Sequence, residues 1–544
     1  MRTEVPPPRP PAITGEKCLL AAFALTAIIQ GLIVVRTSVI TRDGVLFIGY
    51  AQSLTVRPVE IMRGMDQHPG YPALILASHW AGARFLSHDA VQSWVVAALL
   101  VSGLCGLATV LLLWRFAKSV FDARVAAVAV FIFAALPLFR DNAATTMSDT
   151  PHLLFYLLAV CLALEGIVRR RFWWFPLAGA ASGIAYWIRP EGLSVALVTA
   201  ALLLFYVLTR TGRLFWLSCM AGVLVAAGAV ALPYAALKGS LTAKKHVTIL
   251  LSSRALAPNR SAAEIRAAAP DGTPQARIGI AGFLAQSPAG PGLKKPSVGL
   301  MFMKAALAIG NKLVQGLRHI FLLPLAVGLF APGHRRAPAE WRVAVPALAG
   351  FHVMLLFVLF FIGGYLSERH TIPLVALAMP WIASGACYIL ETMAPFVPQH
   401  RAVGQRLGPE WSWVLLGFLL VIPMIPRSIR PLYGQWAPLV NAARWIRATA
   451  SPGDAVLTNS TYVGFYANIR SEVIHEGSAL PKLQGPDGRL AYRFAVFYTA
   501  DQDFKREWLE KMSPFYETLH LDEGAGTPGE FTMLIAKPVQ APPP

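Results

Sequence analysis

Five charged residues lie at the ends of long apolar runs, where they could perform chemistry at a membrane surface. They are Asp43, Asp149, Arg189, Glu191 and Arg369. A carboxylate can accept a proton from an attacking hydroxyl group. A fixed arginine stabilises the charge that develops on a departing phosphate. This combination predicts a group-transfer reaction at the boundary between membrane and water.

Each of these residues also has a purely structural interpretation. Asp43 and Asp149 could cap helix N-termini, where a carboxylate is favourable. Arg189 and Glu191 flank a proline and could simply pair with each other. Arg369 could extend its charged end from the bilayer to the interface. We favour catalysis for Asp43 and leave both interpretations open for the others.

Membrane-spanning helices are the elements that would position these residues. Of 544 residues, 55% are hydrophobic and 14% are charged, and the mean hydropathy is +0.53. Apolar runs of the about 17–25 residues needed to cross a bilayer recur along the chain, which excludes a soluble globular protein. We predict a polytopic α-helical membrane protein with about eleven crossings, their boundaries uncertain by about 2–4 residues. They are placed at residues 19–36, 91–114, 125–139, 152–168, 173–188, 192–208, 214–236, 315–331, 343–363, 371–391 and 411–426, and the region near 300–315 could hold another.

The distribution of lysine and arginine between the connections predicts the orientation. With the N-terminus inside, the inner connections carry clusters such as residues 169–171, whereas the short outer connections carry single arginines. Residues 1–18 then form a cytoplasmic tail and residues 19–426 the membrane domain. Two long outer segments follow from this, at about 37–90 and 237–303.

The chain after residue 426 is less apolar and is typical of a small extracytoplasmic α/β domain, residues 427–544. Its patterns predict helices at 439–450 and 503–512 and strands at 455–459, 493–500 and 531–538. This domain and the two outer segments contain none of the five cysteines, so they have no disulfide available.

The charge distribution favours chemistry at the membrane surface over transport. The middles of the predicted helices carry almost no Asp, Glu, Lys or Arg, whereas transporters concentrate such residues near the midplane. A lipid-carrier flippase or transporter is therefore the alternative, and a membrane scaffold that binds a partner is a third.

Metal and nucleic-acid functions find little support. Asp66 and His68 could contact a divalent cation, but two ligands at this spacing do not define a site, so we disfavour a metal. The formal charge of +19 arises partly from the basic segment at 237–303. That segment would attract anionic lipid phosphates or acidic glycans, unless long translocated loops simply escape the orientation rule. Without a recognition motif, these residues do not indicate nucleic-acid binding.

Five stretches carry a resemblance to a known family. They are "TRDGVLFIGYAQSL", "QHPGYPALILA", "MSDTPHLLFYLLAVCLALEG", "GIAYWIRPEGLSVAL" and "SERHTIPLVALAMPWIASG". In this order they resemble bacterial membrane glycosyltransferases of the GT-C superfamily, specifically the protein O-mannosyltransferase and aminoarabinose-transferase branch. The resemblance spans about residues 19–391.

The resemblance implies an inverting transfer of sugar from a polyprenyl-phosphate donor to a glycan, lipid or protein acceptor. The reaction would take place on the outer face of a bacterial inner membrane. By matching the family's motifs, Asp43 and Asp149 would be catalytic. The donor would be bound by Arg369, Arg189, His68, Tyr71, His370 and Glu191. His68 lies where many relatives have a Lys-Pro-Pro stretch, and a neutral imidazole would hold a phosphate less strongly than lysine.

Overall fold

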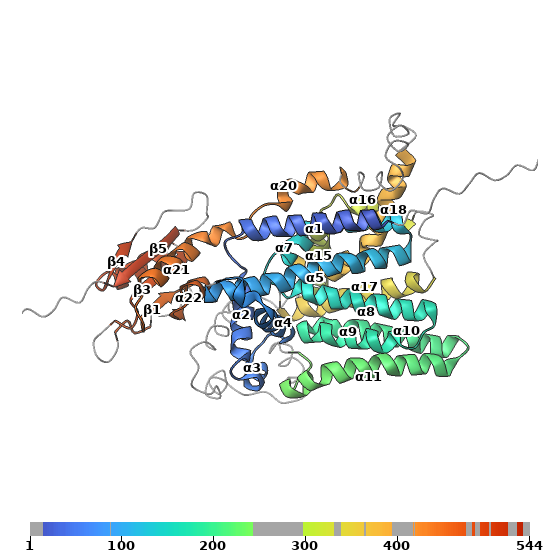
Figure 1. The fold of residues 1–544 in the computed structure, drawn as a ribbon, viewed down its shortest axis with the longest axis horizontal. Helices are drawn as coiled ribbons and strands as arrows, with labels where there is room; N and C mark the ends of the chain where they lie inside the picture. The colour runs from blue at the N-terminus through green and yellow to red at the C-terminus, as the bar shows by residue number, and fades with distance from the viewer. Residues whose placement is uncertain are drawn as a thin grey trace, which may run out of the picture.

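Long helices lie side by side through most of the chain, and a small sheet packs at one end of them (Figure 1). The computed structural model describes residues 15–87, 89–242, 298–330, 339–363, 366–393, 417, 419–474, 481–484, 490–499, 502–519 and 530–536. Two predicted features fall largely outside these ranges, namely the basic segment at 237–303 and the crossing at 411–426. Of the latter, η7 (Ile422–Met424) is described.

Seven helices in the described ranges are long and apolar enough to span a membrane, and two bent helix pairs raise the number to nine. The chain is therefore an integral, multi-pass membrane protein, as the sequence predicts. The seven are formed by α1 (Glu16–Arg36), α5 (Ala90–Val120), α8 (Asp149–Arg169), α10 (Leu193–Thr209) with the short helical turn before it, α11 (Arg213–Lys238), α17 (Ala339–Gly363) and α18 (Ile372–Met393) with the short helical turn before it. Each lies where a crossing is predicted. A further predicted crossing is α9 (Trp174–Ile188), whose fifteen residues extend about 22 Å, less than the ~30 Å hydrocarbon core.

The predicted helix at 125–139 is wrong as a single element, because the chain forms two helices there. α6 (Ala123–Ala135) and α7 (Pro137–Ala143) meet at 63°. Leu136 between them has an extended backbone, since a proline disfavours helical backbone in the residue before it. α6 lies in the centre of the bundle, and all its residues from Val125 to Ala135 are buried.

The predicted helix at 315–331 is also wrong in its limits. α15 (Val298–Leu317) and α16 (Leu322–Phe330) meet at 98°. Arg318 and His319 interrupt the helix with positive φ angles, and Pro324 lies in the first turn of α16, where it removes no helical hydrogen bond.

The predicted outer segment at 37–90 is mostly helical. It contains α2 (Arg42–Leu54), α3 (Pro58–Gly64), α4 (Gly70–Ala81) and the short η1 (Ala83–Phe85). α2 contacts α4, and both contact α5. This segment thus forms a packed layer between the bundle and the C-terminal sheet (Figure 1).

A C-terminal domain with a five-stranded sheet follows the bundle. Its strand order is β2-β1-β3-β5-β4, with β1 parallel to β2 and β3, and β5 antiparallel to β3 and β4. The predicted helices and strands of this domain are all present, whereas β2, β4 and α22 were not predicted. In chain order the elements are α20 (Ile425–Ser428), η8 (Gly434–Trp436), α21 (Ala437–Thr449), β1 (Ala455–Thr458), α22 (Thr461–Ala467), β2 (Arg470–Val473), β3 (Phe494–Thr499), α23 (Gln502–Met512), β4 (Tyr516–Leu519) and β5 (Glu530–Ala536).

The C-terminal domain shares a hydrophobic core with the layer beneath it. Residues of α21, α22 and β3 pack in one cluster with residues of α2, α4 and the N-terminal part of α5. α5 has 31 residues and is about 46 Å long, so it extends beyond a ~30 Å bilayer core into this cluster. The backbone N–H of Ile40 donates to the Tyr466 hydroxyl over 3.1 Å, and Arg447 pairs with Asp89 at 2.7 Å.

Candidate active site

Asp43 lies in the first turn of α2 and forms an ion pair with Arg369. The Arg369 Nη1 atom lies 2.6 Å from Asp43 Oδ2, and the side chains are 30% and 40% exposed. The capping role belongs to Thr41, whose hydroxyl accepts from the N–H of Gly44 over 2.8 Å. The carboxylate of Asp43 is therefore available for another purpose.

Close packing fixes the start of α2 against the loop that precedes α8. A Cβ atom on Gly44 would lie 1.7 Å from the Thr146 hydroxyl oxygen, so only glycine fits there. The Thr41 and Thr146 hydroxyls are also 3.2 Å apart, within hydrogen-bond distance. Three residues after Thr146 the chain reaches Asp149, so the two predicted catalytic acids lie on adjoining elements.

Asp149 is the first residue of α8, and its carboxylate pairs with Arg189 rather than capping the helix. Arg189 also lies 3.4 Å from Glu191. The side chains of Asp149, Arg189 and Glu191 are only 5%, 15% and 17% exposed. The expected pairing of Arg189 with Glu191 is thus part of a larger buried cluster.

A tight turn between α9 and α10 holds Arg189 in place. Arg189 terminates α9 and is followed by η2 (Pro190–Gly192). A Cβ on Gly192 would lie 2.2 Å from a backbone carbon of Ala185, and the Ser182 hydroxyl donates to the Gly192 carbonyl over 2.7 Å. The turn has no space for a side chain at Gly192. This close packing fixes the backbone from which the Arg189 side chain extends.

A small cavity joins the two groups of charges. It has room for about one water molecule, roughly 20 Å³. Seven of its ten lining residues are polar or charged, and most of the lining residues come from α8, α17, η2 and η5 (Glu368–Thr371). The lining residues are Asp149, His152, Arg189, Glu191, His352, Leu356, Arg369, His370, Ile372 and Pro373.

His370 is part of this wall and also stabilises η5. Its Nδ1 accepts from the backbone N–H of Ser367 over 3.1 Å, while the Ser367 side chain completes a capping box. The residue therefore fixes the backbone that carries Arg369.

His68 and Tyr71 do not line the cavity. Both are buried, and His68 Nδ1 lies 2.8 Å from the carbonyl oxygen of Tyr186. The Tyr71 hydroxyl donates to the Ala98 carbonyl and lies 2.9 Å from Ser102 Oγ. These contacts tie α4 to α5 and α9. In the described part of the chain, no group of three or more His, Cys, Asp or Glu side chains could hold a metal ion.

His152 and His352 line the cavity but were not predicted from the sequence. His152 lies one helical turn after Asp149 and so on the same face of α8. His352 lies halfway along the apolar helix α17, where any ionisable residue suggests a function. Neither residue is a permanently charged type, so the scarcity of Asp, Glu, Lys and Arg within the apolar helices did not reveal them.

Two further polar residues of interest, Arg140 and Tyr433, are not among the residues that line the cavity. Arg140 on α7 is buried, pairs with Asp141 at 2.7 Å and donates to the carbonyl of Arg427. Tyr433 lies within electrostatic range of Asp43 and Asp149. Burial, with a contribution from Asp141, raises the pKa of Tyr433 to about 12, so its phenol stays neutral.

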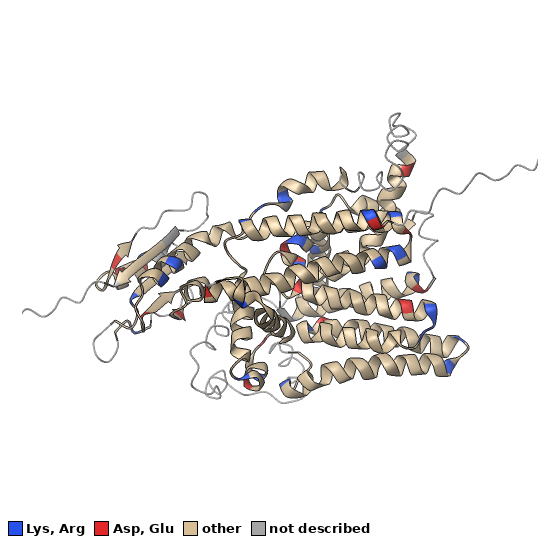
Figure 2. Cartoon of the chain, in the orientation of Figure 1, with Lys and Arg blue, Asp and Glu red and all other residues tan. Residues whose placement is uncertain are grey.

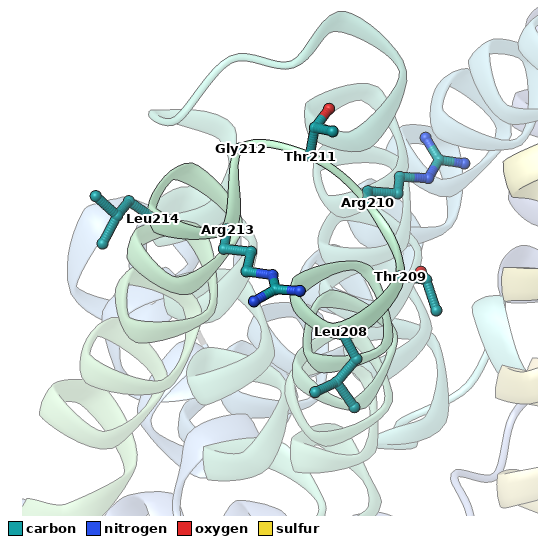
Figure 3. Close-up of a pocket in the computed structure, with 7 residues that line it drawn as sticks. All are labelled: Leu208, Thr209, Arg210, Thr211, Gly212, Arg213 and Leu214. Atoms are coloured by element: carbon teal, nitrogen blue, oxygen red, sulfur yellow. The ribbon is translucent and has the colours of Figure 1, made fainter.

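The opposite end of the bundle is chemically different. Figure 2 shows that lysine and arginine gather there, at the helix ends far from the sheet. A shallow depression is present in the turn between α10 and α11, lined by residues 208–214 alone (Figure 3). Arg210 in this turn pairs with Glu340 at 3.4 Å. The depression has no acid among its lining residues and is not a candidate active site.

Comparison with known proteins supports the assignment of the fold. Residues 73–236 match the family model described as dolichyl-phosphate-mannose-protein mannosyltransferase. No curated protein matches the chain by sequence. The structure of ArnT from Cupriavidus metallidurans bound to undecaprenyl phosphate is similar to this one, with a TM-score of 0.57 and 14% sequence identity. The match covers 98% of this chain and 100% of that one. The structure of ArnT from the same organism in the apo state is 12% identical in sequence to this chain and gives a TM-score of 0.53. The match covers 96% of this chain and 98% of that one.

An archaeal structure is similar as well. The apo oligosaccharyltransferase of Archaeoglobus fulgidus is 13% identical with a TM-score of 0.51, covering 92% of this chain and 69% of that one. The predicted GT-C fold is therefore confirmed. The chain shares the fold of these solved enzymes, and residues 73–236 in addition resemble the mannosyltransferase family.

Proposed function

We propose that this protein transfers a sugar from a polyprenyl-phosphate carrier to an acceptor on the outer face of a bacterial inner membrane. The observation that carries the proposal is the half-exposed pair of Asp43 and Arg369, placed beside a small cavity that is lined mainly by polar and charged residues at one end of the membrane domain. ArnT, a protein of the same fold, has been crystallised with undecaprenyl phosphate. A carrier of this kind suits an active site at the membrane surface, because its tail can remain in lipid while its phosphate reaches water.

The reaction follows from the roles of these two residues. The acceptor hydroxyl attacks the anomeric carbon and its proton moves to the Asp43 carboxylate. The bond between the anomeric carbon and the phosphate oxygen breaks, and the electron pair leaves with the lipid phosphate. Attack from the side opposite the phosphate inverts the anomeric configuration. Arg369 stabilises the charge on the departing phosphate, with Arg189 fixing the wall of the site.

Charge balance suggests how the donor prepares the base. Asp43, Asp149 and Glu191 provide three carboxylates, whereas Arg369 and Arg189 provide two guanidinium groups. A donor phosphate that binds Arg369 competes with Asp43 for the same guanidinium. Binding of the donor would therefore release the Asp43 carboxylate, which could then accept a proton from the acceptor.

The proposal is tested by Asp43→Asn in the purified full-length protein. The amide is nearly isosteric but cannot accept a proton, so transfer from undecaprenyl-phosphate sugars should fall by about 10²–10⁴-fold. Asp454→Asn is the matched control, because Asp454 pairs with Arg493 at 2.7 Å in the C-terminal domain. Near wild-type transfer by Asp43→Asn would exclude this residue as the base.

The outer location of the site needs a separate test. Single cysteines at Glu510 in α23 and at Thr211 in the turn between α10 and α11 would be labelled with a membrane-impermeant maleimide in whole cells. The native cysteines are buried or half-buried, so the wild type serves as the background. We expect labelling at position 510 alone, and labelling at position 211 alone would place the site on the inner face.

A further inference from the structure

Two histidines in the cavity have polar atoms that the fold does not use. His152 and His352 are only 4% and 2% exposed. His152 Nε2 and His352 Nδ1 are buried and have no hydrogen-bond partner within the described ranges. Leaving a buried polar group unsatisfied is costly, so such groups indicate a ligand or an ordered water.

The hydrogen bond made by Nε2 of His352 determines whether Nδ1 of the same ring is a donor or an acceptor. His352 Nε2 lies 2.9 Å from the backbone carbonyl oxygen of His370, which can only accept. Nε2 therefore carries the hydrogen, and in the neutral ring Nδ1 is an acceptor. A ligand at this position must donate a hydrogen.

His152 faces the same cavity from the opposite helix. The rings of His152 and His352 both pack near the ring of Tyr156, with centroid separations of 5.8 and 6.3 Å. In the tautomer that carries a hydrogen on Nε2, His152 is a donor. In that tautomer the two histidines present one acceptor and one donor to a cavity of about one water molecule, which Asp149 and Arg189 also line.

We propose that His152 and His352 bind one uncharged hydroxyl group of the donor sugar. This inference rests on the proposed function. A hydroxyl both donates and accepts and is close to water in size, whereas an ammonium group only donates and an acetamido group is too large. The pair would thus restrict donors to neutral sugars that carry an unmodified hydroxyl at the position facing the cavity.

Two substitutions at His352 separate this role from a structural one. His352→Asn places an amide oxygen near the position of Nδ1, so it keeps the acceptor but loses the bond to the His370 carbonyl. His352→Gln reaches the position of Nε2, so it keeps that bond but loses the acceptor. A purely structural histidine is replaced better by glutamine, and a ligand-binding one by asparagine.

The measurement compares dissociation constants for two kinds of probe in detergent. The first is undecaprenyl phosphate, which carries no sugar, and the second is undecaprenyl phosphate bearing mannose, glucose, arabinose, 4-aminoarabinose or N-acetylglucosamine. We expect the wild type to prefer a neutral sugar to the bare carrier. His352→Gln should weaken binding of that sugar donor about 3- to 10-fold, as for one hydrogen bond, and leave the bare carrier unchanged.

A series of monodeoxy donors then identifies the hydroxyl. The donor that lacks the bound hydroxyl should bind the wild type and His352→Gln equally well, while the other deoxy donors should still distinguish them. His152→Ala should give the same pattern as His352→Gln. Such agreement would assign both histidines to one group of the sugar.

Several results would overturn the inference. Normal donor binding in His352→Gln with a loss in His352→Asn would make His352 a support for η5 only. Preference for the amino or acetamido sugar would exclude a hydroxyl-specific site. If the wild type transfers a neutral sugar but His352→Gln binds it normally, the histidine site fails and the proposed function stands. If the wild type binds none of the carriers and transfers no sugar, both fail.

Discussion

The two groups of ion pairs in the site differ in their exposure to solvent. Asp43 and Arg369 are 40% and 30% exposed, whereas Asp149 and Arg189 are 5% and 15% exposed. An exposed pair contributes about 0–1 kcal/mol and can separate readily. Removing one partner of a buried pair leaves an uncompensated charge and costs about 3–5 kcal/mol. The exposed pair is therefore suited to exchanging partners during a reaction, and the buried cluster to holding its shape.

This difference divides the roles predicted from the sequence. Arg189 and Asp149 were expected to bind the donor and to assist catalysis, but their mutual contact leaves little of either side chain accessible. We therefore assign the buried cluster chiefly to positioning the cavity wall. Under the proposed function, Asp43 and Arg369 are the residues that would contact the reacting groups.

The largest effect should come from breaking the buried cluster. Arg189→Gln leaves Asp149 and Glu191 buried without their cation, and we expect a loss of about 3–5 kcal/mol in the free energy of unfolding. Thermal unfolding in detergent would measure it. The triple variant with Asp149→Asn and Glu191→Gln should recover much of this loss. A single variant as stable as the wild type would show that the cluster is not a structural unit.

A smaller but selective effect is expected at the exposed pair. Arg369→Gln should weaken binding of undecaprenyl phosphate by about 10- to 100-fold, the effect of losing a hydrogen bond to a charged group. Its stability should change by no more than about 1 kcal/mol. The affinity of Arg369→Lys for undecaprenyl phosphate should lie between those of the wild type and Arg369→Gln, because lysine keeps the charge but lacks the planar guanidinium fork. Unchanged affinity in both variants would remove Arg369 from the donor site.

Competition for Arg369 predicts a change in the opposite direction at Asp43. Asp43→Asn removes the carboxylate that pairs with Arg369, so undecaprenyl phosphate should bind about 2- to 10-fold more tightly, by roughly 0.4–1.4 kcal/mol. The same variant should lose transfer activity. Weaker binding would instead show that Asp43 helps to hold the carrier, and the proposed release of the base would be wrong.

The smallest effect is expected at a third ion pair, Asp89 and Arg447, which serves as a control for an exposed pair that does not line the cavity. Asp89 and Arg447 are 44% and 35% exposed and are not among the residues that line the cavity. Arg447→Gln should change stability by about 0–1 kcal/mol and leave carrier affinity unaltered. A loss of carrier affinity here would mean that the C-terminal domain contributes to donor binding.

The same pair has a defined pH dependence. Burial alone would raise the pKa of Asp89, but hydrogen bonds from Arg447 and from the backbone of Gln92 and Val91 lower it. A carboxyl group whose pKa is lowered by folding stabilises the protein above its unfolded pKa of about 3.9. This contribution is lost as the pH falls through the folded pKa. The stability difference between the wild type and Arg447→Gln should therefore disappear at acidic pH.

The sequence predicted the charged residues of the site better than their contacts. Asp43, Asp149, Arg189 and Arg369 were identified because charges are rare beside apolar runs, and three of the four line one cavity. Their pairing could not be predicted, since Asp43 and Arg369 are 326 residues apart in the chain. His68 was included because of a family motif, but its ring instead packs within the fold.

The sequence predicted correctly those parts of the fold that follow from the length and spacing of apolar runs. The long spans follow directly from apolar length, whereas the bends after Ala135 and Leu317 depend on local backbone geometry. Pro137 was visible in the sequence and could have indicated the first bend, because a proline disfavours helical backbone in the residue before it. The positive φ angles of Arg318 and His319 had no comparable signal.

The central position of α6 has a consequence for biosynthesis. In the finished protein α1, α5 and α18 surround it, and its residues from Val125 to Ala135 are shielded from lipid. α18 begins about 240 residues after α6 ends, and at about 5–20 residues per second the ribosome needs roughly 10–50 s to reach it. During that interval α6 must reside in the bilayer with one side open to lipid. The enclosure of this helix is therefore one of the last steps in the assembly of the membrane domain.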